Sequence, residues 1–314
     1  MPRTIISLRL RFLHNRTPRT AHMQTGIVGL GAMGAHMARN LHRAGLLTGV
    51  WNRTTEKATA LAAELKVHSF ASLEELAGNC EAVVICVSAD DDLRAVIAGL
   101  DKGLTPNMIV MDCSTVGKNT VREIHEQLAA LGVGFLDCPV SGGVEGARTA
   151  SLAIMVGGDE SVFTRAQPIL EKLGKAVAYM GSSGAGQAAK ATNQIMCAGI
   201  IQAVGEAMAF AHAECLPLKQ VIDVLGKGAG SSWYFVNRAP FMANNNFPAG
   251  FRVRLHDKDL RICRDMAARH GAVLPVVEST LAEYAKLISQ GFGDEDISSI
   301  YRLKTKLFPD SEST

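Results

Sequence analysis

Residues 29–41 read "GLGAMGAHMARNL", with glycines at the first, third and sixth positions. The stretch completes the short apolar run "GIVGL", which predicts a buried strand. Beyond it, Met33, Met37 and Leu41 recur at i, i+4 and i+8, a spacing that predicts a helix over residues 32–44. A GxGxxG pattern is informative only where a strand precedes it and a helix begins inside it, and both conditions are met here.

Each glycine has a separate physical reason in such a loop. Gly29 permits a tight turn, Gly31 lets the backbone approach a pyrophosphate, and Gly34 lets the helix pack close to the strand. Free backbone N–H groups and the helix dipole then favour an anion. The pattern predicts a dinucleotide-phosphate site; the alternative is a tight turn without a ligand. The residues of the predicted phosphate site are Gly29, Leu30, Gly31, Ala32, Met33 and Gly34.

The end of the second predicted strand, "VWNRT", separates two classes of dinucleotide. A site for NAD places an Asp or Glu there to hold the ribose hydroxyls, and this chain has none. Arg53 follows Gly31 by 22 residues, near the expected spacing of about 20. Its guanidinium fits a phosphate, Asn52 does not repel one, and Thr54 adds a hydroxyl. These residues favour NADP(H), with NAD(H) possible; the alternative is that Arg53 is a solvated cation.

Apolar strands alternate with amphipathic helices as far as about residue 182. Near-continuous apolar runs such as "EAVVICVS" are typical of parallel strands buried on both faces. Beyond the boundary "SSGAGQ", a long apolar helical segment covers residues 185–216, and a helix that is apolar all round is expected to be buried between domains or subunits. Further helices are expected around 217–226, 257–270, 276–290 and 296–306.

The predicted fold is α/β, an N-terminal Rossmann-type doubly wound parallel sheet followed by a C-terminal all-α domain. The expected divisions are a dinucleotide-binding domain over 23–185, a substrate and oligomerisation domain over 186–308 and a tail over 309–314. Residues 1–22 hold five arginines and no acid. They are expected to precede a true start at Met23 in a cytoplasmic protein; the alternative is a transit segment for the mitochondrial matrix.

Composition excludes several classes of protein. The 314 residues carry a net charge of +2, which gives no reason to expect nucleic acid as a partner. Seven scattered cysteines without a CxxC pair predict reduced core thiols and no metal site. No uninterrupted apolar run reaches the roughly 18–20 residues of a membrane span.

Two later motifs carry groups suited to chemistry. "DCPVSGG" (137–143) ends in a turn where Ser141, Gly142 and Gly143 offer N–H groups and a hydroxyl to an anion. In "GAGQAAKATNQ" (184–194), Lys190 and Asn193 share one helix face. Desolvation lowers the pKa of a lysine and makes it a usable proton donor near neutrality. Alternatively, Lys190 is a snorkelling cation.

Taken together with the later "HDKDLRIC" (256–263), these motifs occur in an order that resembles the β-hydroxyacid dehydrogenase family and, more distantly, 6-phosphogluconate dehydrogenases. The resemblance covers residues 23–306. It implies an NADP(H)-dependent oxidoreductase that interconverts a short hydroxy acid with its semialdehyde or oxoacid. Within the family, a glyoxylate/succinic semialdehyde or tartronate semialdehyde reductase is favoured over a 3-hydroxyisobutyrate dehydrogenase that uses NAD. A non-catalytic scaffold is disfavoured by Lys190, Asn193 and the Ser-Gly-Gly turn, and an imine reductase by Lys190. A methyltransferase is disfavoured by the "NRT" turn and the lysine-bearing second domain.

The resemblance also implies roles for individual residues. Lys190 is the implied general acid and base, with Asn193 orienting the substrate or the lysine, and the Ser141–Gly143 turn holds a small carboxylate substrate. Trp233 and Tyr234 lie in "GAGSSWYFVNR" (228–238), either as a wall of the substrate pocket or as packing. The long apolar helix suggests a homodimer or homotetramer. The remaining implied cofactor contacts are Val87, Ser88, Ser114, Thr115, Lys258 and Asp259.

Overall fold

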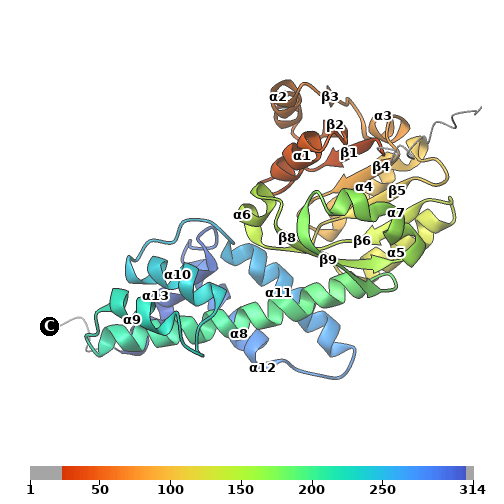
Figure 1. Ribbon diagram of the computed structural model, residues 1–314. Coiled ribbons are helices and arrows are strands. Elements are labelled where there is room, and N and C mark those ends of the chain that lie inside the picture. The colour runs from red at the N-terminus through yellow and green to blue at the C-terminus, as the bar shows by residue number, and fades with distance from the viewer. Residues whose placement is uncertain (1–22, 309–314) are drawn as a thin grey trace, which may run out of the picture.

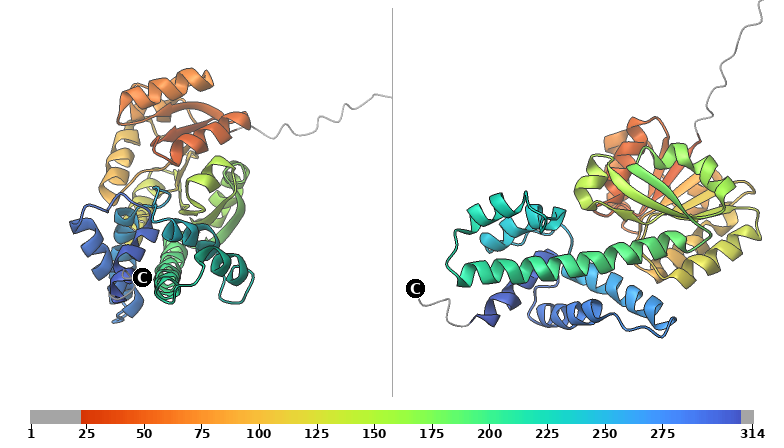
Figure 2. Two further views of the ribbon diagram at one scale, coloured as in Figure 1. Left: turned by 90° about the vertical axis from the view of Figure 1, so that its left-hand side faces the viewer. Right: turned by 60° about the horizontal axis from the view of Figure 1, so that its bottom comes forward.

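The computed structural model describes residues 23–308, so the expectations for residues 1–22 and 309–314 lie outside the described part of the chain. A mixed sheet with helices on both faces forms one body, and a cluster of helices forms the other (Figure 1). The long helix α8 (Ala185–Ala213) begins beneath the sheet and runs through the helical cluster (Figure 2).

Within the described residues the sheet has nine strands. Its first six follow the order β3-β2-β1-β4-β5-β6, all parallel, which is the doubly wound arrangement with its switch point between β1 and β4. The strands are β1 (Thr25–Val28), β2 (Leu47–Trp51), β3 (His68–Ser69), β4 (Ala82–Ile85), β5 (Ile109–Asp112), β6 (Gly134–Asp137), β7 (Val140–Ser141), β8 (Leu152–Gly158) and β9 (Gly174–Gly181).

The doubly wound parallel sheet is confirmed, and three further strands extend it at the β6 edge. β8 runs antiparallel to β6, β7 runs antiparallel to β8, and β9 returns parallel to β8. β6 and β7 pair with β8 in one continuous register, so the chain runs on through both strands and turns back only between Ser141 and Leu152, where the short helix α6 lies.

Two hydrophobic clusters cover opposite faces of the sheet. Met37, Leu41 and Leu61 belong to one, and Leu93 and Ile97 to the other. Each such fully buried Leu or Ile side chain stabilises the fold by about 1.5–3 kcal/mol. The helices around the sheet are α1 (Gly34–Arg43), α2 (Thr55–Leu65), α3 (Leu73–Gly78), α4 (Asp90–Leu100), α5 (Lys118–Ala129), α6 (Gly143–Arg148) and α7 (Glu160–Leu170), with a 3₁₀ turn η1 (Asp101–Gly103).

The second body packs around α8 and has its own core, which includes the fully buried Tyr284. Its other elements are α9 (Leu218–Leu225), α10 (Trp233–Ala243), α11 (Val253–Ala268), α12 (Pro275–Ser289), η2 (Ile297–Ile300), α13 (Tyr301–Lys304) and η3 (Thr305–Leu307). The sequence did not predict α10, which contains Pro240, and it placed the start of α11 too late. The last expected helix, 296–306, is a short α-helix between two 3₁₀ turns.

The expectation that α8 is buried on all sides holds only in part. Its contacts with β8, α10, α11 and α12 bury one face, while Met196 and Phe210 stay exposed. By length and composition alone α8 is also apolar enough to cross a membrane, although it contains no uninterrupted apolar run of that length. One face of it packs against β8 and three helices of the second body.

Candidate active site

The glycine loop lies where β1 ends and α1 begins. Gly29 has φ +90°, and a Cβ there would stand 2.2 Å from the carbonyl oxygen of Cys86. A Cβ on Gly34 would stand 1.9 Å from the carbonyl oxygen of Gly29. These two positions therefore require glycine for the fold itself.

Gly31 is different, because no atom of the protein lies within 4 Å of the place where its Cβ would be. Within residues 23–308, the backbone N–H groups of Gly31, Ala32 and Met33 also have no hydrogen-bond partner. An open cradle with free donors at the start of a helix fits the pyrophosphate of a dinucleotide.

The residues after β2 have distinct contacts. The side-chain oxygen of Asn52 accepts a hydrogen bond from the N–H of Leu30 (2.8 Å), so Asn52 holds the glycine loop in place. Arg53 is 84% exposed, and its Nη1 lies 2.7 Å from Oδ1 of Asp92. Thr54 precedes the first residue of α2, without a hydrogen bond from its side chain to the helix. Arg53 thus follows the residue that holds the glycine loop, and its own side chain reaches α4 through Asp92.

The loops after β4 and β5 are joined through Ser114. The N–H of Val87 donates to the Ser114 hydroxyl (2.9 Å), while Ser88 is exposed. Lys258 on α11 donates through Nζ to the carbonyl oxygen of Thr115. This bond connects the second body to the edge of the sheet where the cofactor residues were predicted.

Buried polar groups fix the start of α8. The N–H groups of Gly184 and Gln187 donate to the two carboxylate oxygens of Asp137 (2.8 and 2.9 Å). A Cβ on Gly186 would come within 2.5 Å of the carbonyl oxygens of Asp137 and Met155. The helix therefore begins in direct contact with the backbones of β6 and β8, which fixes the residues of its first turns.

Lys190 lies on this fixed segment and is 7% exposed. Burial lowers the pKa of its ammonium group, and the nearby carboxylate of Asp259 partly offsets this. No hydrogen bond or ion pair to the ammonium group is found within residues 23–308. A buried amine with a lowered pKa and free donors is suited to proton transfer.

Polar neighbours surround Lys190. Asn193 donates through Nδ2 to Oε1 of Gln194 (2.8 Å) and contacts Sγ of Cys197 at 3.5 Å. Gln194 in turn donates to Oδ2 of Asp259 (2.7 Å). The other oxygen of Asp259 lies 3.2 Å from Nζ of Lys258. Lys190, Asn193 and the Lys258–Asp259 pair thus belong to one neighbourhood.

The aromatic stretch at the start of α10 divides into three environments. Trp233 is exposed and lies under the guanidinium of Arg238, Phe235 is buried in the core of the second body, and Tyr234 is half-buried. The Tyr234 hydroxyl lies close to the thiol of Cys197 and affects the pKa of that thiol. Because Lys190, Asn193 and Cys197 share one face of α8, Tyr234 stands beside that face.

The Ser-Gly-Gly turn follows β7. Ser141 is half-buried, and Gly142 and Gly143 are exposed with φ of +130° and +61°. No protein atom lies within 4 Å of a Cβ placed on Gly143. The turn is open on this side, as an anion contact requires.

Sequence reasoning missed several supporting residues. Asp112 and Asp137 stand side by side at the ends of β5 and β6. Burial raises the pKa of Asp112 to about 7, and its Oδ2 has no hydrogen-bond partner within the described residues. Gln187 accepts from the N–H of Val116 (3.3 Å) and donates to the carbonyl oxygen of Ser114 (2.9 Å). For Asp112 and Asp137, the available sequence signal was a polar residue at the end of an apolar strand.

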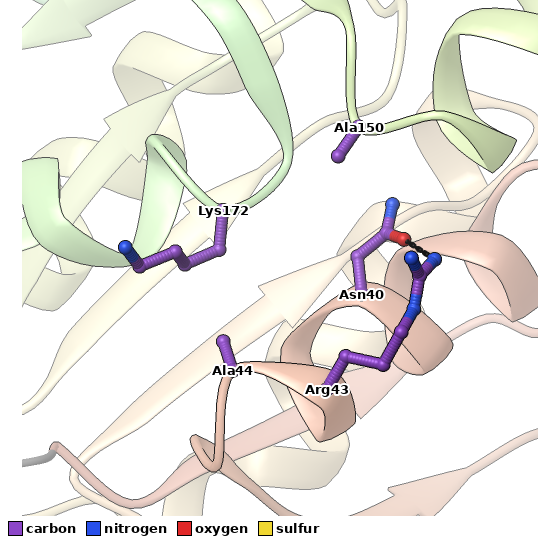
Figure 3. Close-up of a pocket in the computed structure, with 5 residues that line it drawn as sticks. All are labelled: Asn40, Arg43, Ala44, Ala150 and Lys172. Carbon is purple, nitrogen blue, oxygen red and sulfur yellow. Dashed lines mark hydrogen bonds between the residues drawn. The ribbon is translucent and has the colours of Figure 1, made fainter.

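A separate hollow of about 370 Å³ lies at the C-terminal end of α1 (Figure 3). Because its lining begins at Asn40, six residues after Gly34, and an α-helix rises about 1.5 Å per residue, the hollow starts roughly 9 Å along α1 from the glycine loop. It therefore does not belong to the cofactor cradle. Its lining residues are Asn40, Arg43, Ala44, Ala150 and Lys172.

Two family models cover most of the chain. One, described as the NAD binding domain of 6-phosphogluconate dehydrogenase, matches residues 24–181. The other, described as the NAD-binding domain of NADP-dependent 3-hydroxyisobutyrate dehydrogenase, matches residues 184–304.

Individual relatives agree with these matches. An uncharacterized oxidoreductase of Synechocystis is 39% identical over 279 residues, covering 87% of this chain and 94% of the relative. An NAD-dependent L-serine dehydrogenase of Pseudomonas aeruginosa is 30% identical, covering 89% and 97%. The solved structure of Mycobacterium tuberculosis 3-hydroxyisobutyrate dehydrogenase with L-serine has a TM-score of 0.82 at 33% identity, covering 90% of this chain and 98% of that one. The chain therefore belongs to the β-hydroxyacid dehydrogenase family, and it is a nicotinamide-dependent hydroxyacid dehydrogenase of the 3-hydroxyisobutyrate dehydrogenase type.

Proposed function

We propose that this enzyme is an NADP(H)-preferring reductase of short semialdehydes or oxoacids, such as glyoxylate, succinic semialdehyde or tartronate semialdehyde. The observation that carries the cofactor preference is the exposed Arg53, two residues after the end of β2, at a place where no carboxylate ends the strand. A guanidinium there suits the 2′-phosphate of NADP.

In this proposal, Lys190 moves the proton. A bound nicotinamide supplies the hydride in reduction and accepts it in oxidation. The Lys190 ammonium donates its proton to the carbonyl oxygen of the substrate, and the neutral amine takes the proton back in oxidation. Its buried surroundings favour the neutral amine, and Asp137 holds the helix segment that carries it.

The remaining residues bind and orient the substrate. Ser141, Gly142 and Gly143 bind the substrate carboxylate, which fits their open turn. Asn193 orients the substrate beside Lys190, and Tyr234 forms one wall of the pocket. The half-buried phenol beside Cys197 limits the space along this face of α8, which favours a short substrate.

The cofactor preference is tested by measuring kcat/KM for NADPH and for NADH with one substrate. We expect a higher value with NADPH, and we expect Arg53→Ala to remove most of the difference because the phosphate loses its cation. Lys57→Ala, an exposed cation on α2, serves as the control and should leave the ratio unchanged. A preference for NADH that survives Arg53→Ala would refute the proposal.

The substrate class is tested with a panel assayed in both directions. Glyoxylate, succinic semialdehyde and tartronate semialdehyde are offered with NADPH; 3-hydroxyisobutyrate and L-serine are offered with NADP and with NAD. The proposal requires that the highest kcat/KM belong to one of the three reductions.

Two observations favour a second candidate, an NAD-dependent 3-hydroxyisobutyrate or L-serine dehydrogenase. Arg53 is paired with Asp92, and one relative is named an NAD-dependent L-serine dehydrogenase. The same panel separates the two candidates, because this one requires that oxidation with NAD be the fastest reaction.

We also propose that the enzyme is a homodimer or homotetramer. The second body exposes apolar side chains that a partner copy would cover, namely Met196, Phe210, Val224, Leu225, Trp233 and Val236. Light scattering of the purified protein tests this, and a monomer at micromolar concentration would refute it.

A further inference from the structure

Three consecutive acids, Asp90, Asp91 and Asp92, begin α4. This helix follows β4, and β4 lies beside β1 on the opposite side from β2. The start of α4 and the end of β2 therefore flank the glycine loop at the carboxyl edge of the sheet. A ligand that lies across this edge is held between them.

The three carboxylates have different partners. Oδ1 of Asp90 accepts from the N–H of Gly117 (2.8 Å) and from the Thr120 hydroxyl (2.5 Å), which connects α4 to α5. Asp91 is fully exposed, and its nearest cation is Arg94 at 3.8 Å. Asp92 alone among the three reaches toward β2, where its Oδ1 lies 2.7 Å from Nη1 of Arg53.

The ion pair between Arg53 and Asp92 opposes the binding of a 2′-phosphate by Arg53. The Asp92 side chain is only 27% exposed, so its carboxylate has less freedom than the 84% exposed arginine. A 2′-phosphate that binds Arg53 must replace Asp92 as the partner of Nη1 or share the guanidinium with it. It also brings a second negative group close to the carboxylate, whereas a ribose without the phosphate does neither.

We propose that Asp92 is a specificity-determining residue that lowers the selectivity of this enzyme for NADP over NAD, because it competes with the 2′-phosphate for Arg53. The inference rests on the proposed function, in which Arg53 binds that phosphate. It places a determinant of cofactor choice on α4, outside the segment after β2 that decides between NAD and NADP in the sequence motif.

The size of the effect follows from the exposure of the pair. An exposed ion pair changes an equilibrium constant by at most about fivefold, and repulsion between the carboxylate and the phosphate adds to the competition. Removing the charge of Asp92 should therefore raise the ratio of NAD Kd to NADP Kd by about 3- to 10-fold at low salt. Screening should reduce the gain at 0.5 M salt, roughly where the Debye length falls below 5 Å.

The test measures the Kd of NADP and of NAD by calorimetry for the full-length protein, Asp92→Asn and Asp91→Asn. Asp91→Asn is the matched control, since it removes the same charge one residue away without a contact to Arg53. We expect Asp92→Asn to tighten NADP and leave NAD nearly unchanged, and Asp91→Asn to have less effect. An equal change for both cofactors, or an equal gain in the two variants, overturns the inference.

A double-mutant cycle tests whether Asp92 acts through Arg53. In the Arg53→Ala background, Asp92→Asn should lose most of its effect on the Kd of NADP. Additive effects of the two substitutions overturn the competition. The failures are distinguishable, because the wild-type Kd ratio tests the proposed cofactor preference, and the change in that ratio tests the role of Asp92.

Discussion

Two helices begin at the carboxyl edge of the sheet, and they differ in whether their first N–H groups have hydrogen-bond partners. Before α1, the N–H groups of Gly31, Ala32 and Met33 have no partner within the described residues. At the start of α8, two N–H groups are taken by the buried carboxylate of Asp137. Unpaired N–H groups at a helix start thus form a cradle for a ligand, whereas N–H groups bonded to a side chain form a rigid junction.

The largest expected effect comes from replacing Lys190, the residue that the closed start of α8 holds in place. Lys190→Ala should lower kcat by roughly 10²–10⁴, because the proton donor is lost. Cofactor Kd should be unchanged, since the open cradle lies elsewhere. Steady-state kinetics and calorimetry measure the two quantities.

The neighbouring Thr192→Ala is the control for this substitution, because Thr192 is exposed and bonds only to the carbonyl oxygen of Ala188 in the preceding turn. Near-normal turnover of Lys190→Ala would remove the lysine from the chemistry.

The pH dependence of the two directions gives the next effect. Burial lowers the pKa of Lys190, so its acid form is lost at a lower pH than in an ordinary lysine. The reductive kcat should fall as pH rises through that lowered pKa, by about tenfold per pH unit for a single proton, and the oxidative kcat should rise over the same range. A reductive rate that stays flat up to the ordinary lysine pKa of about 10.4 would contradict this.

Asp137→Ala would open the closed helix start. The substitution removes two hydrogen bonds to the first turn of α8, so we expect the free energy of unfolding to fall by about 2 kcal/mol and the Tm by roughly 5 °C. The kcat should fall as Lys190 loses its fixed position. Thermal unfolding and kinetics measure both effects.

Asp159→Ala provides the comparison for that experiment. Asp159 also precedes a helix, α7, but its side chain makes no hydrogen bond to it. If both variants unfold at the same temperature, the Asp137 carboxylate does not hold the junction.

The smallest effect tests the open cradle. Gly31→Ala should raise the Kd of the cofactor about tenfold, equivalent to roughly 1.4 kcal/mol, because its methyl group enters the space left for the pyrophosphate. Tm should not change, since no protein atom lies within 4 Å of that methyl group. Gly78→Ala, equally open but in α3, should leave the Kd unchanged; equal Kd values for both variants would contradict a ligand at Gly31.

The open helix start was predictable from sequence, and the closed one was not. In the loop, backbone geometry excludes side chains at Gly29 and Gly34, so the requirement appears as glycines at fixed spacing. Asp137 lies 47 residues before Gly184, and no local spacing relates a carboxylate to an N–H group that far along the chain. The contact exists only because β6 ends beside the start of α8.

The missed helix α10 has a similar cause. Pro240 and the preceding "GAGSS" oppose a helix on local grounds, yet Phe235, Ala239 and Met242 bury one face of it in the second body. Tertiary packing outweighs the local preference there. The ion pair between Asp92 and Arg53 was equally hidden, since its partners are 39 residues apart.

The direct contact of Gly186 with two strands constrains how the molecule can move. A helix that starts against the carbonyl oxygens of Asp137 and Met155 cannot bend freely at that point. We therefore expect α8 and the helices packed on it to move as one rigid unit. Widening the space between the two bodies would break the bonds from Lys258 to the carbonyl oxygen of Thr115 and from Arg269 to the side-chain oxygen of Asn119, both of which join α11 to the sheet body. These bonds lie apart from the Asp137 junction, so the second body is fastened to the sheet at two separate places.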